Sequence, residues 1–311
     1  MAGVTDMAFR SLCASLLPSL RTTTEMVSAK ALCYGNAKTA VLTRVSPAER
    51  HASVQLFGSD PEIMACAARQ TAALPGVTAI DINMGCPTPK IVACGDGCAL
   101  MRHPEKARAV IAAVVAAVDL PVTVKFRKGW DSAHVNCVEF AEAAEAAGAA
   151  ALCVHGRTRA QLYSGRADRK CIAAVKRAVG IPVTANGDID SPEAALRCRA
   201  ATNADMYMVG RAAFGNPWLL AQIDSALRGL PPPPPPPVAE RLETAREQFT
   251  QAAKDKGEKA ACLEARRHLS WYLRGIPGAA YYRREASAVS TPEDISRLIA
   301  RVTRDCGCDN G

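Results

Sequence analysis

The sequence lacks any apolar run long enough to cross a membrane. Its longest uncharged apolar stretch covers residues 109–118, well short of the roughly 20 residues that a membrane-spanning helix needs. The first twenty residues carry an aspartate and an arginine, whereas a secretory signal has a basic start and an apolar core. We therefore expect a cytoplasmic protein that has no membrane partner.

A disulfide framework is not expected either. The thirteen cysteines are odd in number, and several, such as Cys13 and Cys153, lie within apolar runs, which indicates buried thiols in a reducing compartment. Cys306 and Cys308 have no second cysteine or histidine pair nearby, as a zinc site would need. We expect no metal site, and a frayed chain end over residues 305–311.

The chain also has no basic tail. Its net charge of +8 divides into +6 over residues 1–237 and +2 over residues 238–311. This excess permits a polyanionic partner such as nucleic acid, which would then bind a surface spread over both parts. Composition alone favours the plainer explanation, which is solvated surface charge.

The first 220 residues repeat one unit, a short apolar run followed by a loop and an Ala-rich amphipathic segment. Strands are predicted at residues 24–28, 53–57, 79–83, 121–126, 151–155, 181–185 and 206–209. Helices are predicted at residues 7–17, 61–73, 104–118, 135–147, 169–178 and 192–200. Such alternation predicts an α/β fold with a parallel sheet. A doubly wound sheet would carry a G-x-G-x-x-G fingerprint, which is missing, so we expect a TIM (β/α)₈ barrel whose first strand is absent from the chain.

Seven consecutive prolines at residues 231–237 divide the chain. They predict a stiff polyproline II spacer, because proline cannot lie inside a helix. Helical patterns follow at residues 238–256, 260–273 and 291–302. We therefore predict a catalytic barrel domain over residues 1–230, a linker over 231–237 and a small helical domain over 238–305.

Polar residues at the predicted strand ends are the candidates for chemistry. Asn83 ends a strand, and Cys86 follows in a loop shaped by glycine and proline, at the barrel end where functional side chains gather. A thiol there can act as a nucleophile, a metal ligand or an acid, although a structural cysteine is the alternative. Lys125 and His155 end the next two strands. The alternation of residues leaves open whether Lys125 points into the barrel or toward the helices.

The last two predicted strands end in Asn186-Gly187-Asp188 and Gly210-Arg211. Glycine lets backbone N–H groups approach an anion, and barrels often bind a phosphate between these two loops. Arg211 adds a fork-shaped donor for phosphate oxygens. This pattern indicates a phosphate-bearing ligand, with two ordinary turns as the alternative.

Taken together, these segments resemble the bacterial tRNA-dihydrouridine synthases over nearly the whole chain. The resemblance rests on five segments in the same order, at residues 1–10, 55–61, 81–87, 155–159 and 186–189. A sixth segment, residues 265–273, is similar to the helical domain of the B-type branch. The resemblance implies an FMN-binding barrel that uses NADPH to reduce the C5=C6 bond of a uridine in tRNA.

The same resemblance implies roles for individual residues. Cys86 would protonate C5 and Asn83 would help to hold the uracil. The residues implied to bind FMN lie at the chain start and at strand ends: Met1, Ala2, Gln55, Lys125, His155, Asn186, Gly187, Asp188, Gly210 and Arg211. Those implied to contact tRNA phosphates lie in the predicted helical domain, where ordinary helix surface is the alternative: Arg266, Arg267, Arg283 and Arg284.

The chain departs from the family pattern at its start. Family members carry a strand ending in Ala-Pro-Met-Ala-Gly, and this sequence begins at that methionine. A barrel of seven strands would have two unpaired edges beside the cofactor. We interpret the sequence as a fragment or a mis-started copy of a working enzyme, since the later motifs are intact.

Two other functions fit the same residues. One is an FMN barrel reductase for free pyrimidines or enones, and the other is a tRNA-binding chaperone that has lost flavin. The arginine-bearing helical domain argues against the first, and the set Asn83, Cys86, Lys125 and His155 argues against the second. No protein partner is evident, and nothing demands more than a monomer.

Overall fold

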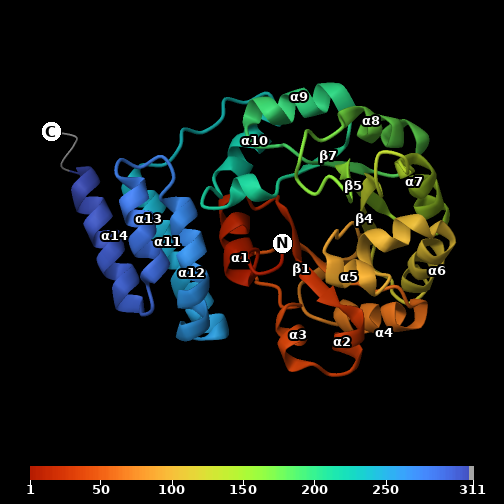
Figure 1. Ribbon diagram of the computed structural model, residues 1–311, viewed down its shortest axis with the longest axis horizontal. Helices are drawn as coiled ribbons and strands as arrows, with labels where there is room; N and C mark the ends of the chain where they lie inside the picture. Colours follow the sequence, from red (N-terminus) through yellow and green to blue (C-terminus); the bar gives the residue numbers. More distant parts are fainter. Residues whose placement is uncertain (308–311) are drawn as a thin grey trace.

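A computed structural model describes residues 1–307 of the chain. Seven parallel strands form one sheet in sequence order. They are β1 (Arg21–Ser28), β2 (His51–Phe57), β3 (Val77–Met84), β4 (Val122–Gly129), β5 (Ala151–Thr158), β6 (Val183–Asn186) and β7 (Met206–Met208). The sheet curls into an incomplete barrel whose edges are β1 and β7 (Figure 1), so the predicted TIM-like barrel with seven strands is confirmed.

Helices surround the sheet on its outer face (Figure 1). The longer ones are α1 (Met7–Leu16), α4 (Pro61–Ala72), α6 (Pro104–Val115), α7 (Cys137–Ala146), α8 (Arg169–Ala178), α9 (Pro192–Thr202) and α10 (Leu219–Leu227). The shorter ones are α2 (Ala29–Cys33), α3 (Ala37–Val41) and α5 (Pro89–Ala93), with 3₁₀ turns η1 (Gly97–Arg102) and η2 (Arg211–Ala213). Local sequence explains where several of them begin. For example, the Asp60 carboxylate accepts from Glu62 N and Ile63 N, and Pro61 occupies the first turn of α4.

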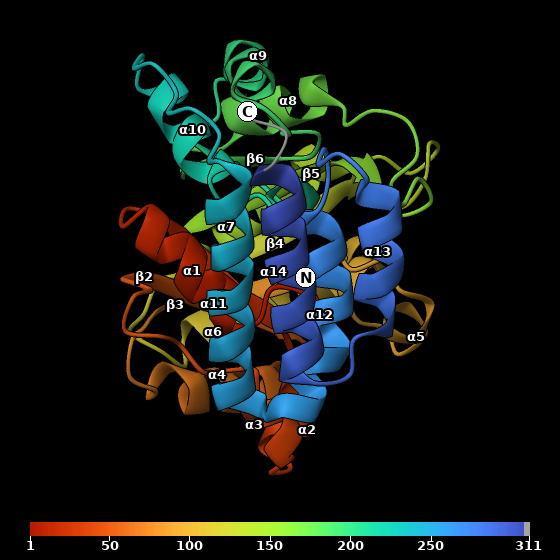
Figure 2. The same ribbon diagram turned by 90° about the vertical axis from the view of Figure 1, so that its left-hand side faces the viewer.

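Up to residue 307, four further helices follow: α11 (Val238–Lys256), α12 (Glu258–Tyr272), α13 (Ala279–Ala288) and α14 (Pro292–Gly307). Figure 2 shows α11, α12 and α14 standing roughly side by side. The helical C-terminal part is therefore confirmed, although α13 had not been predicted. Because α14 runs to Gly307, the expectation of a frayed end is wrong for residues 305–307, while Cys308 lies outside the described residues.

The strands separate apolar from polar side chains. On β3 and β4, Ile80, Ile82, Val124 and Phe126 are buried in the hydrophobic core that the strands share with the outer helices. The alternate positions point into the barrel and are polar, because successive side chains along a strand face opposite sides. The barrel interior is therefore lined with hydrogen-bonding groups at successive inward-facing positions along the strands.

Candidate active site

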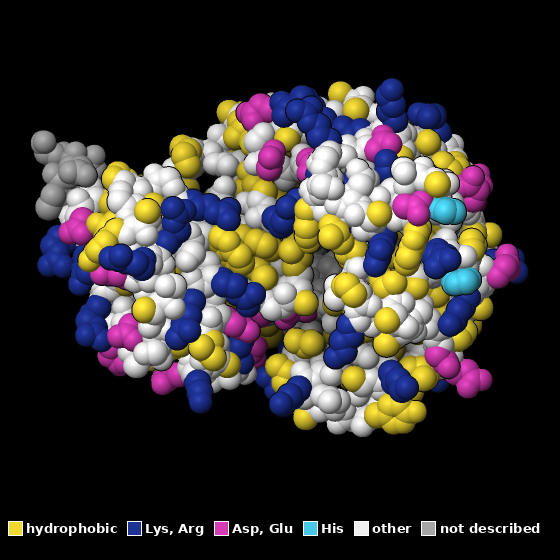
Figure 3. All heavy atoms as spheres, viewed as in Figure 1, with side chains coloured by type: hydrophobic (Ala, Val, Ile, Leu, Met, Phe, Trp, Pro, Cys, Tyr) yellow, Lys and Arg dark blue, Asp and Glu magenta, His cyan; other side chains and the backbone are white. Residues whose placement is uncertain are grey.

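The candidate site lies at the carboxyl ends of the strands. Register places Asn83 beside Lys125, Arg127 beside His155, and His155 beside Asn186. Lys125 Nζ donates to Asn186 Oδ1 across the interior at 3.1 Å, so the lysine points into the barrel. Figure 3 shows a hollow near the start of the chain with several Lys and Arg side chains around it.

A chain of hydrogen bonds leads from the barrel interior to Cys86. Gln55 Nε2 donates to Asp81 Oδ2 at 2.7 Å, and Asn83 Nδ2 donates to Gln55 Oε1 at 2.8 Å. Asn83 Oδ1 then accepts from the backbone N–H groups of Gly85 and Cys86, at 3.1 and 2.9 Å. Each bond fixes which end of an amide faces the next residue. The chain thus begins at a carboxylate and ends at the backbone of the candidate acid.

Asp81 is fully enclosed in the barrel. Burial raises its pKa, while hydrogen bonds from the Thr123 hydroxyl and the Gln55 amide oppose that shift. Asp81 therefore serves as the acceptor that orients Gln55.

Cys86 itself is buried at the side of this chain. Its Sγ donates to Thr88 Oγ1 at 3.3 Å, and its backbone carbonyl accepts from Cys98 N at 3.1 Å. Gly97 approaches so closely that an added Cβ would lie 2.8 Å from the Cys86 carbonyl oxygen. The thiol therefore has a fixed position next to Asn83.

Positive charge surrounds His155. Burial, and then the charges of Lys125, Arg127, Arg157 and Arg211, lower its pKa to about 2. The imidazole is therefore neutral at neutral pH. A concentration of cations around a neutral ring suits an anionic ligand.

The β6 loop is shaped for close approach. Gly187 has a φ of +118°, and an added Cβ would lie 2.7 Å from Ala167 Cβ and 2.9 Å from His155 Cδ2. The Asp188 carboxylate bonds Arg157 Nη2 at 2.7 and 2.8 Å. The absence of a side chain at Gly187 thus lets the β6 loop pack directly against Ala167 and His155.

The structure brings most of the predicted cofactor residues to one end of the barrel. Met1 also lies there, since a Cβ added to Gly210 would lie 4.0 Å from Met1 Sδ. Arg211 is exposed, with its guanidinium 4.1 Å from the centre of the Tyr163 ring. Whether these residues bind a cofactor stays a prediction.

The four predicted tRNA arginines are placed differently. Arg266 Nε donates to Val289 O, and Arg267 Nη2 donates to Gly3 O, each at 2.8 Å. These two bonds hold together parts of the fold. Arg283 and Arg284 are exposed on α13, and Arg267 is exposed on α12, where a polyanion could reach them.

Sequence reasoning did not single out Asp81, Thr123 or Arg127 as site residues. Each of them occupies an alternate position on a strand, next to a side chain buried in the core. Polar residues at every second position of a buried parallel strand are the signal that could have found them.

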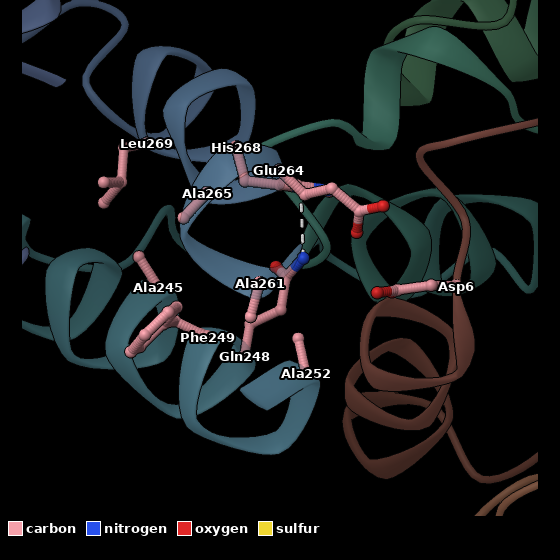
Figure 4. A pocket seen from close by; sticks show the side chains of 10 residues that line it. All are labelled: Asp6, Ala245, Gln248, Phe249, Ala252, Ala261, Glu264, Ala265, His268 and Leu269. Carbon is pink, nitrogen blue, oxygen red and sulfur yellow. Dashed lines mark hydrogen bonds between the residues drawn. The ribbon is translucent and has the colours of Figure 1, made fainter. Parts of the chain in front are cut away.

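A second pocket lies between α11, α12 and the start of α1 (Figure 4). Gln248 Nε2 and His268 Nδ1 are 3.0 Å apart at its wall, and burial is the main reason that the pKa of His268 falls to about 4. Asp6 and Glu264 reach it from the two sides, and Lys256 Nζ bonds both. These groups are satisfied by one another and lie away from the strand ends, so the pocket belongs to the packing of the helices.

The family model described as Dihydrouridine synthase (Dus) matches residues 1–305. The chain belongs to this family. Dihydrouridine synthases are flavin-dependent oxidoreductases, so the predictions of the family and of an enzyme are confirmed.

Named relatives agree with this placement. "Probable tRNA-dihydrouridine synthase 1" of Synechocystis sp. is 43% identical over 299 residues, which cover 96% of this chain and 83% of that protein. "tRNA-dihydrouridine synthase B" of Pseudomonas aeruginosa is 42% identical over 283 residues, 91% of this chain and 85% of the relative. The protein of the same name in Vibrio cholerae is 41% identical over 293 residues, 94% and 90% of the two chains.

The fold is also similar to the solved structure of 6-hydroxypseudooxynicotine amine oxidase (HisD) from Pseudomonas geniculata N1, with a TM-score of 0.54 and 14% identity. The match covers 72% of this chain and 44% of that one. The matched part thus spans less than half of that protein, and the likeness concerns the fold alone.

Two further features of the structure concern metal-binding groups and membrane-spanning helices. Within residues 1–307, no group of three or more His, Cys, Asp or Glu side chains is placed to hold a metal ion. No helix in this described part is long and apolar enough to cross a membrane.

Proposed function

We propose that this member of the dihydrouridine synthase family reduces the C5=C6 bond of a uridine in tRNA, with FMN as its flavin and NADPH as the reductant. The observation that carries the proposal is the hydrogen-bonded path that fixes Cys86 next to Asn83, beside a group of cations. Uridine, NADPH and one proton give dihydrouridine and NADP⁺. When bound, the flavin supplies a hydride to C6 of the uracil.

The residues of the chain supply the rest of the reaction. Hydride addition at C6 builds negative charge at C5 and O4, so a proton donor held near C5 lowers the barrier. Cys86 Sγ is the proposed donor, with its proton passing to C5. Asn83 keeps one amide N–H beyond its bond to Gln55, and this N–H is available to a uracil carbonyl.

The FMN phosphate is proposed to bind at Gly187 and Gly210, close to Arg211. Lys125 and His155 lie deeper, where the ring and ribityl arm of the cofactor would contact them. Lys125 already bonds Asn186, which holds its charge in the interior rather than in solvent. Gln55 keeps one N–H beyond its bond to Asp81, and this donor is available to the flavin ring.

The C-terminal helices are proposed to bind tRNA phosphates through Arg266, Arg267, Arg283 and Arg284. The last three of these are exposed. Residues 231–237 are proposed as the link between a catalytic barrel and this helical unit. A tRNA substrate places the activity in the cytoplasm, and we propose that the monomer is the active form. The target base must leave its stack, at a cost of roughly a few kcal/mol that tRNA contacts offset.

Single-turnover reduction of unmodified tRNA by the flavin-loaded protein tests this function, read as a mass gain of two hydrogens. Replacing Cys86 with Ala should slow the reaction by about 10²- to 10⁴-fold, because a general acid contributes about that much. Cys94→Ala is the matched control, since Cys94 is an exposed thiol after the same loop.

The outcomes separate the alternatives. A wild-type protein that binds tRNA but holds no flavin and adds no hydrogen would be the non-catalytic binding protein. Reduction of free uridine as fast as of tRNA would favour a small-molecule reductase. Equal rates for wild type and Cys86→Ala would remove the acid role from Cys86.

A further inference from the structure

The loop after β5, residues 159–166, presents two apolar side chains to solvent at its tip. Leu162 is 50% exposed and Tyr163 is 51% exposed. Leu162 has a φ of +49°, a left-handed conformation that is an outlier for a bulky residue. A strained, exposed, apolar tip persists only where the surrounding structure enforces it.

Two buried arginines enforce this conformation. Arg127 Nη1 donates to the carbonyls of Thr158 and Leu162, at 2.9 and 3.0 Å. Arg157 donates to the carbonyls of Ser164 and Gly165, at 3.1 and 2.7 Å. Arg127 lies on β4 and Arg157 on β5, so these bonds fix the tip to the strands that form the site.

The tip is tied to the catalytic loop by the same guanidinium. Arg127 Nε donates to the carbonyl of Gly85, the residue before Cys86, at 3.0 Å. Gly85 and Leu162 therefore bond to one planar group. A substrate base that reaches Cys86 must bring its neighbouring nucleotides close to this tip.

The surroundings of the tip are cationic and aromatic. The Arg211 guanidinium lies 4.1 Å from the centre of the Tyr163 ring. Trp130 follows β4, and its ring centre lies 4.8 Å from the guanidinium of Arg159, which follows β5, and 5.0 Å from that of Arg102 at the end of η1. Rings interleaved with guanidiniums complement RNA, because bases stack on the rings and phosphates attract the cations.

We infer that Tyr163, supported by Leu162, is a stacking platform for an RNA nucleotide that adjoins the target uridine. This inference rests on the proposed function. A uridine drawn out of its stack leaves a neighbouring base with an uncovered face, and a rigid exposed ring can cover it. Being held in place before binding, the platform loses little conformational freedom when RNA arrives.

Fluorescence anisotropy with labelled unmodified tRNA tests the inference over a series of salt concentrations. Tyr163→Ala should weaken binding by about 5- to 150-fold, which is the range for one lost stacking contact. Tyr163→Phe keeps the ring and should bind like wild type. Leu162→Gly keeps the left-handed backbone and should weaken binding less than Tyr163→Ala.

The salt dependence distinguishes a stacked base from a phosphate contact. Loss of stacking leaves the slope of log K against log salt unchanged, whereas loss of one phosphate contact reduces it by about one. The matched control is Tyr34→Ala, because Tyr34 is an exposed tyrosine at the end of α2. Thermal unfolding of each variant checks that folding is intact.

Three results would overturn the inference. The first is an unchanged affinity of Tyr163→Ala for tRNA, and the second is an equally large loss of tRNA affinity in Tyr163→Phe. The third is slower flavin reduction by NADPH in Tyr163→Ala with unchanged tRNA binding, which would mean that the dinucleotide contacts the tip. If the wild-type protein reduces tRNA and the Tyr163→Ala variant binds tRNA as tightly as wild type, only this inference is rejected. Wild-type protein that reduces no tRNA rejects the proposed function instead.

Discussion

Asp81 determines the direction of the hydrogen bonds in the site. Its carboxyl oxygens accept from Gln55 Nε2 and from the Thr123 hydroxyl, which leaves the Gln55 oxygen facing Asn83. The Asn83 oxygen is thereby turned toward the Cys86 backbone. One buried carboxylate thus sets two amide orientations and the position of a thiol.

His155 predicts how stability depends on pH. Its pKa is about 2 in the folded protein and about 6.5 in an unfolded chain, so below pH 6.5 the unfolded chain binds the extra proton. The stabilising contribution is complete above that pH and declines as pH falls. Between pH 7 and 5 the free energy of unfolding of the apoprotein should drop by about 2 kcal/mol from this residue alone.

Urea unfolding of wild type and His155→Asn at both pH values measures that contribution. The variant should lose less stability between pH 7 and pH 5 than wild type, whatever its stability at pH 7. Equal losses in the two proteins would show that His155 is not held neutral.

The turn between η2 and α10 packs closely against the end of α12. Gly215 has a φ of +67°, and an added Cβ would overlap the Trp271 backbone and lie 2.5 Å from Tyr272 N at the end of α12. Beside it, the rings of Phe214 and Trp271 stack with their centres 4.7 Å apart. The barrel and the last helices therefore meet at backbone distance.

Gly215→Ala should consequently destabilise the protein by about 2–5 kcal/mol. The added methyl group would overpack this contact, and alanine would have to adopt a left-handed backbone conformation. Gly229 provides the matched control, since it has a φ of +75° with nothing within 4 Å of an added Cβ. Gly229→Ala should cost only about 1–2 kcal/mol. Urea unfolding compares the two, and equal losses would mean that contact with α12 has no energetic weight.

At the scale of the whole molecule, side-chain contacts hold the C-terminal helices to the barrel. Trp218 and Ala8 are buried in the hydrophobic core of those helices. Lys256 bonds Asp6, and Arg44 Nη1 lies 3.1 Å from Asp255 Oδ1. The helices thus rest directly against α1, close to the chain start in Figure 1.

Replacing residues 231–237 with seven glycine and serine residues should therefore leave the arrangement unchanged. We expect the radius of gyration from X-ray scattering to stay the same and tRNA affinity to change by less than about twofold, because contacts rather than chain stiffness fix the geometry. Stability should fall somewhat, as a flexible segment gains freedom when unfolded. A clearly larger radius would mean that the prolines hold the two parts together.

Much of the fold could be read from periodicity. Every predicted strand is present, because buried parallel strands give apolar runs bounded by loops. Helix α13 was missed because only Tyr282 and Ala286 are buried on it, too few to give a period. The interior polar residues, such as Asp81 and Thr123, were missed because their sequence neighbours dominate the apolar runs.

The sequence by itself determined the alternation of strands and helices, the family, and the place of Cys86 after a strand end. Only the tertiary structure decided that Lys125 points into the barrel and that Arg266 and Arg267 bond to backbone carbonyls elsewhere in the fold. It also decided that Tyr163 is exposed on a loop whose carbonyls are bonded by two buried arginines. The physical reason is that local periodicity says which side chains share a face. Which face becomes the interior, and which carbonyls a distant guanidinium reaches, depends on how the whole sheet curls.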